Sequence, residues 1–434
     1  MNQSLTTGAA VSRRGSSAIV IIGVLFFIFG FVTWLNSILI PFLKLTCELT
    51  SDMQAFLVTS AFYMSYFFLG MPSSHILQKT GFKNGMALGL LVMALGSLIF
   101  IPAARSRSFP LFLVGLFVQG GGLTLLQTAS NPYATVLGPI ESAAKRISIL
   151  GVCNKVAGAI SPLVLGAIVL KGAGQQELRV KAAATVAEKE QLLNAMGSKV
   201  ILPYIIMALV LAALSWVIKR SSLPEIELDG EDGVPAETTA RTSIFQFPHL
   251  VLGAICLFLY VGAEVMAGDA IGMYGRAMGM SLDTTRYFTT CTMMAMLAGY
   301  ITGIFTIPKY LSQQQGLSIS AIAGLAFTTC ALLTKGYISI SFVALLGLAN
   351  ALMWPAIWPL AIGGLGRFTK KGSGLLIMGI IGGGLIPPVY GALKENAAVG
   401  NSLAFFICML PCYLFIFYYS TSGYKVGRSS LTAN

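Results

Sequence analysis

Residues 149–168 read ILGVCNKVAGAISPLVLGAI, an apolar stretch that contains a single charged residue, Lys155. A helix needs roughly 20 consecutive apolar residues to cross the hydrocarbon core of a bilayer, and this stretch has that length. Stretches of similar character recur along the whole chain. The sequence therefore predicts an all-α membrane protein that crosses the bilayer many times, rather than a protein with one anchor.

The composition supports this prediction. Of the 434 residues, 56% are hydrophobic and 10% are charged, against roughly 25% charged in soluble domains. These proportions exclude a soluble enzyme, a disordered protein and a nucleic-acid binder. At about 36 residues for each span with its loop, the chain holds about twelve spans. We predict them at 17–43, 52–78, 84–104, 109–137, 144–171, 199–219, 247–275, 284–308, 316–335, 337–366, 371–394 and 399–420.

Two longer connections interrupt the series of spans. Residues 172–198 mix Ala, Leu, Val, Lys and Glu at helical spacing, which predicts a helix outside the bilayer. Residues 220–246 are rich in Pro, Gly, Thr and acidic residues, a composition typical of a flexible linker. Because this linker follows the sixth span, we predict an N-terminal six-helix bundle at 1–219, a cytoplasmic linker at 220–246 and a C-terminal six-helix bundle at 247–434.

The two predicted halves resemble each other at a constant spacing of 225 residues. A parallel repeat of six plus six spans is typical of transporters of the major facilitator type, whose substrate binds near the midplane between the halves. We therefore predict the major facilitator fold, with twelve transmembrane helices in two six-helix halves related by pseudo-two-fold symmetry. The matched positions are Lys145-Arg146 with Lys370-Lys371, Pro162 with Pro387, and Gly166 with Gly391.

The basic residues indicate how the chain is oriented. We interpret the net charge of +12 as a bias of Lys and Arg among the loops, not as a basic binding face. If the N-terminus is cytoplasmic, the loops on its side carry a modest excess of these residues, including Lys79, Arg146 and Lys371. We therefore expect a multi-pass protein of the cytoplasmic (inner) membrane with both termini in the cytoplasm, acting as a monomer.

Three ionisable residues fall inside predicted spans, where a charge is costly unless it has a partner or water. Lys155 lies about 15 Å into the fifth span, at 1.5 Å per residue. Glu264 and Asp269 lie in the seventh span. One interpretation is a structural ion pair with Lys155 or Arg276. The other is a binding site for a coupling cation or a proton, which intramembrane carboxylates commonly mark.

The spacing of the two carboxylates bears on that choice. Residues five apart on an ideal helix are about 140° apart, so Glu264 and Asp269 share one site only if the helix loosens. Gly262, Gly268 and Gly272 favour local unwinding, and unwound carbonyls can add oxygen ligands. Lys155 either reaches toward the cytoplasmic surface or faces inward. In the inward position it donates hydrogen bonds to a hydroxylated solute or neutralises a carboxylate while the cation is absent.

Neutral polar residues recur in corresponding spans of the two halves. Amides both donate and accept, which suits a ring of hydroxyls, and a Trp face suits the apolar face of a sugar. The alternative is that the amides hold helices together and the Trp residues lie in the interfacial belt. We predict a sugar site formed by Asn36, Gln127, Asn131, Asn154, Lys155, Asn350 and Trp354.

Six stretches of the chain resemble the fucose–galactose–glucose:cation symporter family of the major facilitator superfamily. They cover both halves in the family's order. The resemblance implies twelve helices, alternating access, and uptake of a monosaccharide with a coupling cation. The stretches are WLNSILIPFLK (34–44), LQTASNPYATVLGP (126–139), ILGVCNKVAGAISPLVLGAI (149–168), LYVGAEVMAGDAIGMYG (259–275), NALMWPAIWPLAIGGLGRFTKKGSG (350–374) and IMGIIGGGLIPPVYG (377–391).

Two departures from the family pattern bear on the cation. Proton-coupled fucose permeases carry an aspartate in the first-span motif and a glutamate in the fourth-span motif, where this chain has Ser37 and Gln127. Glu264 in VGAEV is similar to the branch described as sodium-dependent glucose/galactose transporters. Asp269 and the pair Asn154-Lys155 resemble a bacterial sugar and N-acetylglucosamine transporter subgroup. The resemblance therefore favours sodium over a proton as the coupling ion.

The sequence leads to a sodium-coupled hexose symporter, with sodium at Glu264 and Asp269. Its expected partners are a monosaccharide (glucose, galactose, mannose or a related sugar), sodium ion and the lipid bilayer, and no organic cofactor. A proton-coupled symporter, an uncoupled facilitator and an N-acetylglucosamine transporter remain open, as does a channel or membrane-embedded receptor. The sequence shows no phosphate loop, nucleophile system or Cys/His cluster, so we predict that it is not an enzyme.

Overall fold

The computed structural model describes residues 4–136, 143–221, 223, 242–307, 309–365 and 368–427. Twelve helical segments in these ranges are long and apolar enough to cross a membrane, which confirms the predicted all-α fold class. The helices are α1 (Ser4–Thr33), α2 (Asn36–Thr46), α3 (Asp52–Ser106), α4 (Phe109–Val136), α5 (Ala143–Val169), α6 (Ala173–Ala182), α7 (Val186–Gly197), α8 (Ile201–Arg220), α9 (Pro248–Gly268), α10 (Ile271–Ala277), α11 (Leu282–Thr285), α12 (Phe288–Thr306), α13 (Gln313–Leu333), α14 (Gly336–Asn350), α15 (Met353–Ile362), α16 (Thr369–Met378), α17 (Gly382–Lys394) and α18 (Gly400–Thr421).

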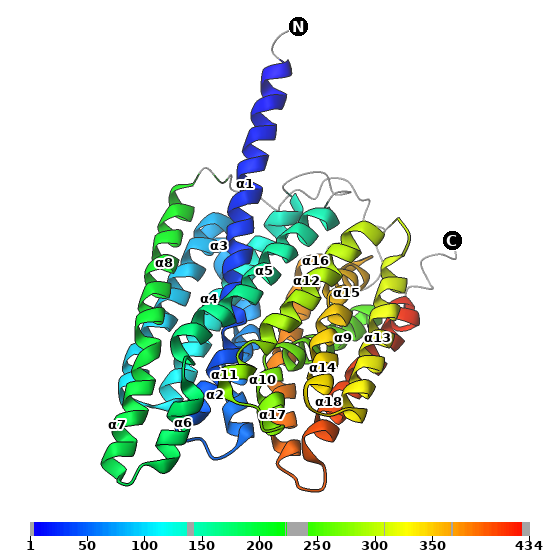
Figure 1. Cartoon of the computed structure of the whole chain (residues 1–434). Coiled ribbons are helices and arrows are strands. Elements are labelled where there is room, and N and C mark those ends of the chain that lie inside the picture. Colours follow the sequence, from blue (N-terminus) through cyan, green and yellow to red (C-terminus); the bar gives the residue numbers. More distant parts are fainter. Residues whose placement is uncertain are drawn as a thin grey trace.

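The helices form two groups that stand side by side in Figure 1. Helices α1–α8, coloured blue to green, form one group, and α9–α18, coloured green to red, form the other. Much of the predicted linker, residues 222 and 224–241, lies outside the described residues. The domain boundaries at 219 and 246 therefore stay predictions.

The second and third spans, Asp52–Leu77 and Lys79–Ser106, are present as two segments, and α3 covers both across a kink at Gly81, where φ is 77°. That left-handed value is readily adopted by glycine, which has no Cβ, so the chain turns there without a loop. Residues 172–198 hold two helices instead of one. The Thr185 side chain accepts a hydrogen bond from the Glu188 amide, an N-cap that starts α7 afresh.

The two groups of helices meet along α3 with α17 and along α5 with α12. The glycines at 382–384 allow the first of these contacts to be close. A Cβ on Gly384 would lie 3.1 Å from both Ser60 Cα and Tyr63 Cβ, and the Ser60 hydroxyl donates to the Gly384 carbonyl at 2.5 Å. Because small residues drive helix packing in a bilayer, these glycines position the interface between the halves.

At the end of the bundle opposite the N-terminus, charged residues link the two groups. Figure 1 shows α6 and α7 at that end. Glu177 of α6 accepts bonds from the Arg276 guanidinium of α10 at 2.8 Å. Asp52 of α3 pairs with Lys394 of α17 at 2.5 Å. Ion pairs therefore link the two groups of helices at this end of the bundle.

We expect Glu177→Gln to destabilise the folded protein by about 1.5–3 kcal/mol, the usual contribution of a hydrogen bond to a charged group. Burial alone would raise the pKa of Glu177, but the bond from Lys181 and the charge of Arg276 outweigh it and hold that pKa below its usual value. The carboxylate is therefore charged at pH 5.5 and 7.5 alike, and its contribution is lost only as the pH falls through the lowered value.

Thermal unfolding in detergent at both pH values measures this effect. Lys181→Gln is the matched control, because its side chain is 69% exposed and such pairs contribute little. A Glu177→Gln protein as stable as the parent, or a deficit present at only one of the two pH values, would contradict the prediction.

Candidate functional site

Spans one, seven and ten are each interrupted by a short break in helical hydrogen bonding. The first break, at Trp34-Leu35, separates α1 from α2. The second, at Asp269-Ala270, separates α9 from α10, and the third, at Ala351-Leu352, separates α14 from α15. The break in span seven immediately follows Gly268. The loosening that the glycines predicted is therefore present beside Asp269.

Two threonines of α12 compensate for the break in span seven. Where a helix ends, its last carbonyls lack intrahelical donors, and in a bilayer they must be satisfied by other protein groups. The Thr292 hydroxyl donates to the Ala267 carbonyl at 2.9 Å, and the Thr289 hydroxyl donates to the Gly268 carbonyl at 2.8 Å. These bonds make the break a fixed feature of the fold.

We expect Thr292→Val to destabilise the protein by about 1–3 kcal/mol, because it removes the donor to a buried carbonyl without changing the volume of the side chain. Thr292 is fully buried. Thr329→Val is the matched control, since Thr329 is exposed and its hydroxyl bonds only to its own helix. Thermal unfolding in detergent compares the two variants, and equal losses would contradict a special role for Thr292.

A buried ion pair links the two halves at the level of these breaks. The Lys155 ammonium of α5 donates to Glu264 Oε1 of α9 at 2.8 Å. The two side chains are 8% and 12% exposed. Between the partners that the sequence left open for Glu264, the structure selects Lys155, because Arg276 binds Glu177 instead. Lys155 faces inward, toward the second half of the molecule.

Trp34 lies beside this pair. The Lys155 ammonium is 4.9 Å from the centre of the indole ring, a distance at which the π-system attracts a cation. The indole is buried, and its N–H has no hydrogen-bond partner among the described residues. Trp34 is not among the predicted sugar residues. The signal that could have found it is the WLNS stretch, where it precedes Asn36 by two positions.

Asp269 has a different environment from Glu264. It is fully buried, and neither carboxylate oxygen has a hydrogen-bond partner within the described chain. The charge of Glu264 and the backbone of Ser37, in the first turn of α2, act on it electrostatically. An unpaired carboxylate is costly in such an interior. Asp269 is therefore the group of this region that most requires a cation or a proton.

Two of the predicted sugar residues lie close to Trp34 and Lys155 in the sequence. Asn154 precedes Lys155 on α5, and its amide donates to the Phe26 carbonyl at 3.3 Å. Asn36 begins α2 and is buried, and its side-chain nitrogen has no partner among the described residues. The unused donor of Asn36 is available to a ligand.

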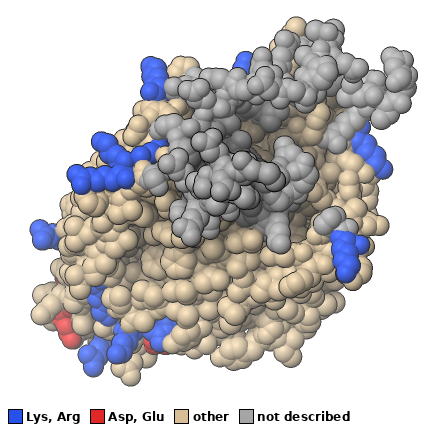
Figure 2. Space-filling view, turned by 90° about the horizontal axis from the view of Figure 1, so that it is seen from above, with Lys and Arg blue, Asp and Glu red and all other residues tan. Residues whose placement is uncertain are grey.

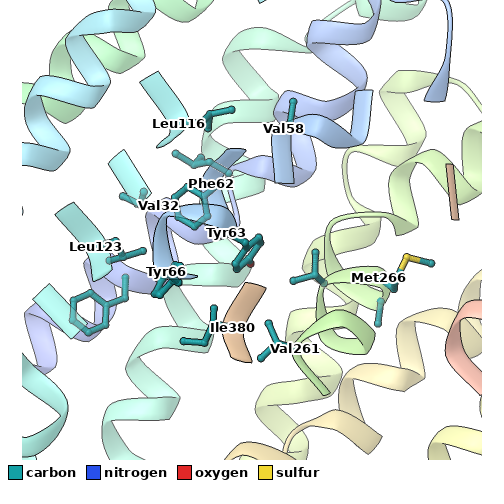
Figure 3. Close-up of a cluster of buried hydrophobic side chains, with 14 of the residues drawn as sticks. Val32, Val58, Phe62, Tyr63, Tyr66, Leu116, Leu123, Val261, Met266 and Ile380 are labelled. Atoms are coloured by element: carbon teal, nitrogen blue, oxygen red, sulfur yellow. The ribbon is translucent and has the colours of Figure 1, made fainter. Parts of the chain in front are cut away.

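Of the two predicted sugar residues in span four, Gln127 has a described side chain. The Gln127 amide donates to the Tyr66 hydroxyl at 3.0 Å. Figure 3 shows Tyr66 and Tyr63 of α3 with Ile380 and Val261 from the other half nearby. The spacing YMSY in span two could have indicated these tyrosines. The side chain of Asn131 lies outside the described residues.

The predicted residues of span ten differ from each other. Asn350 is fully buried, and its side-chain oxygen accepts a bond from the Tyr413 hydroxyl at 2.9 Å. Trp354 stacks on Trp358 at 5.6 Å between ring centres, and Tyr260 lies 6.3 Å away. Tyr260 stands four residues before Glu264 on α9 and also interacts with it. An aromatic row thus runs from Trp354 to the ion pair.

Comparison with known proteins identifies the class of molecule. The family model of the Major Facilitator Superfamily matches residues 22–388. The chain belongs to the major facilitator superfamily. It is therefore a transporter and not an enzyme, as the sequence predicted.

Individual relatives in this superfamily cover almost the whole chain. A glucose/galactose transporter of Brucella abortus (biovar 1, strain 9-941) is 33% identical over 427 residues, 98% of each chain. The L-fucose-proton symporter of Escherichia coli K12 is 29% identical over 401 residues, 91% of this chain and 90% of that protein. These relatives confirm the resemblance to the fucose–galactose–glucose:cation symporter family.

A solved structure supports the same assignment. The major facilitator transporter FucP in the outward conformation aligns with a TM-score of 0.72 and 27% identity, over 93% of this chain and 97% of that chain. A D-xylose-proton symporter aligns with a TM-score of 0.66 at 16% identity, which shows the shared fold alone.

Proposed function

We propose that the chain is a symporter that imports a hexose by alternating access, driven by a cation that binds at Asp269. The observation that carries this proposal is the fully buried Asp269 carboxylate, whose two oxygens have no partner among the described residues. A cation or proton neutralises such a group. Carrying that ion across the membrane requires the buried site to open to one side and then to the other. That requirement is the basis of coupled transport.

Several observations support a sugar as the solute. Lys155 and Asn36 offer hydrogen-bond donors near the broken helices, and Trp354 offers an aromatic face. Relatives that align over nearly the whole chain are named glucose/galactose transporters. In our proposal the sugar binds among Asn36, Gln127, Asn131, Asn154, Lys155, Asn350 and Trp354.

We propose sodium as the coupling cation. The protonatable residues of the fucose permeases are replaced here by Ser37 and Gln127. A hard cation takes several oxygen ligands, and the Asp269 carboxylate adjoins the interrupted backbone at Gly268. In this account Lys155 neutralises Glu264, so Asp269 is the carboxylate that is left to bind the cation.

A proton is the second candidate. It is favoured by the relative named L-fucose-proton symporter. A single buried carboxylate is sufficient to carry a proton.

We also propose that the protein is a monomer of the cytoplasmic membrane with both termini inside the cell. Figure 2 views the molecule from its N-terminal end and shows Lys and Arg side chains at several points of the outline, with a few Asp and Glu side chains at the lower left. Lys79, Lys219 and Lys371 are exposed. This distribution agrees with the preference of basic residues for the cytoplasmic side. The six-plus-six division at residues 220–246 is part of the same proposal.

Uptake into proteoliposomes tests the proposed function. Labelled glucose uptake is measured under an imposed sodium gradient, an imposed pH gradient, both, or neither, with galactose, mannose and N-acetylglucosamine as competitors. We expect accumulation above the outside concentration with the sodium gradient. Accumulation with the pH gradient alone would show that the coupling ion is a proton and not sodium. Equilibration without accumulation under every gradient would show a facilitator and refute coupling.

A further inference from the structure

Trp34 is held between glycines that belong to the two halves of the molecule. A Cβ added at Gly158 of α5 would lie 2.4 Å from Trp34 Cδ1, and one at Gly268 of α9 would lie 2.1 Å from Trp34 Cζ3. Real Cβ atoms do not approach so closely, so each position needs glycine for the indole to remain where it is. The indole is therefore in direct contact with both halves at once.

One face of the indole contacts the predicted sugar side of the region. The Lys155 ammonium lies 4.9 Å from the ring centre and also pairs with Glu264. The indole therefore helps to hold the ammonium where it meets Glu264. A ligand that draws Lys155 away weakens the attraction between the ammonium and the ring.

The other contacts of Trp34 lead to Asp269. Gly268, which the indole touches, immediately precedes Asp269 at the break. The Ser37 hydroxyl donates to the Trp34 carbonyl at 2.8 Å, and the backbone of the same Ser37 acts on the Asp269 carboxylate. A displacement of Trp34 thus changes the surroundings of Asp269 through both the first and the seventh span.

We propose that Trp34 is the positioning residue that couples sugar binding at Lys155 to cation binding at Asp269. The inference rests on the proposed function and adds the residue that connects its two sites. Sugar hydroxyls that bond to the Lys155 ammonium release its hold on the indole. The indole, which already touches Gly268, then shifts against that glycine into the arrangement that favours cation-bound Asp269. Coupling of this kind is reciprocal, so the cation strengthens sugar binding by the same factor.

The test measures that factor directly. Binding of labelled glucose to the purified protein is titrated without sodium and with saturating sodium chloride, and again at low and high pH. We expect a change of about 5–150-fold in the parent, less than twofold in Trp34→Leu, and an intermediate value in Trp34→Phe, which restores an aromatic face. Trp216→Leu is the matched control. Trp216 also has a cation over its ring, that of Arg220, but its side chain lies on α8 and is 58% exposed.

The outcomes separate coupling from a structural role. If Trp34→Leu keeps the parent's factor, or weakens glucose binding equally with and without cation, Trp34 does not couple the sites and the inference is wrong. If the parent binds glucose with no dependence on either cation, the proposed function fails and the inference fails with it. If the parent shows the dependence and only the Trp34 result disagrees, the proposed function stands without this residue.

A second pair of variants tests the contact itself. Gly268→Ala places a methyl group against the Trp34 ring and is expected to reduce the coupling factor as Trp34→Leu does. Leucine has no atom in the place of Cζ3, so adding Gly268→Ala to Trp34→Leu is expected to cause no further loss. If the two substitutions reduce the coupling factor independently, so that their effects multiply in the double variant, the contact between Trp34 and Gly268 does not connect the two sites.

Discussion

Replacing Asp269 with asparagine is expected to abolish cation-driven accumulation of sugar while leaving exchange of sugar across the membrane. Asparagine has nearly the volume of aspartate, but it carries no charge and takes up no cation. The side chain is fully buried and no ion pair with it is recorded among the described residues, so the substitution breaks no ion pair there. The folded protein is therefore expected to persist without its coupling site.

Proteoliposomes separate the two activities. Accumulation is measured under the gradient that drives the parent, and exchange is measured as counterflow with no gradient. In Asp269→Asn, accumulation should fall to the outside concentration, while counterflow stays within a few-fold of the parent. Asp283→Asn serves as the matched control, because its side-chain oxygen can still accept the bond from the Gly174 amide. Accumulation in Asp269→Asn equal to that of the control would contradict the assignment.

Replacing Lys155 with methionine is expected to have the largest effect on stability. The substitution leaves the Glu264 carboxylate in the interior without its cation. Removing one partner of a buried pair costs about 3–5 kcal/mol, much more than the pair itself contributes. We therefore expect little folded Lys155→Met protein in the membrane and a strongly reduced unfolding temperature.

The double variant Lys155→Met with Glu264→Gln separates the ion pair from other roles of Lys155. Removing both charges leaves no uncompensated carboxylate, so most of the lost stability should return. Coupled transport should not return, because the sugar contact of Lys155 is gone. Lys181→Met, at an exposed pair, controls for loss of a lysine. A double variant as unstable as Lys155→Met alone would show that the pair with Glu264 is not the cause.

The fold was predictable because the bilayer imposes a length on each helix. Runs of about 20 apolar residues have few alternatives, and the number of spans follows from them. The sequence did not show how tight the turn between spans two and three is, because that turn needs only the positive φ of Gly81. Likewise, a helical composition over 172–198 does not reveal that Thr185 starts a second helix.

The partners within the site were less predictable. The depth of Lys155 and Glu264 in their spans marked both as exceptional, yet they lie 109 positions apart in the chain. A one-dimensional pattern shows which side chains share a helix face, but it does not show which other helix they meet. For the same reason the sequence did not reveal that Tyr413 occupies the Asn350 oxygen or that Trp34 lies against Lys155.

The position of the break in span seven depends both on the local sequence and on a neighbouring helix. The glycines at 262, 268 and 272 predicted loosening, but the exact position depends on α12, whose threonines satisfy the carbonyls of Ala267 and Gly268. The result is that Glu264 lies within α9 and faces Lys155, whereas Asp269 lies at the break. Two carboxylates that look equivalent in the sequence therefore have different roles in our account.

The central claim is that sugar and cation cross together through a site that contains Asp269. Sugar-evoked cation entry tests it most directly: glucose is added to proteoliposomes without any imposed gradient, and entry of labelled sodium and of protons is followed in the parent and in Asp269→Asn. The account predicts that glucose brings sodium into vesicles that contain the parent and no cation into those that contain the variant. Glucose-evoked cation entry of equal size in the two proteins would contradict it.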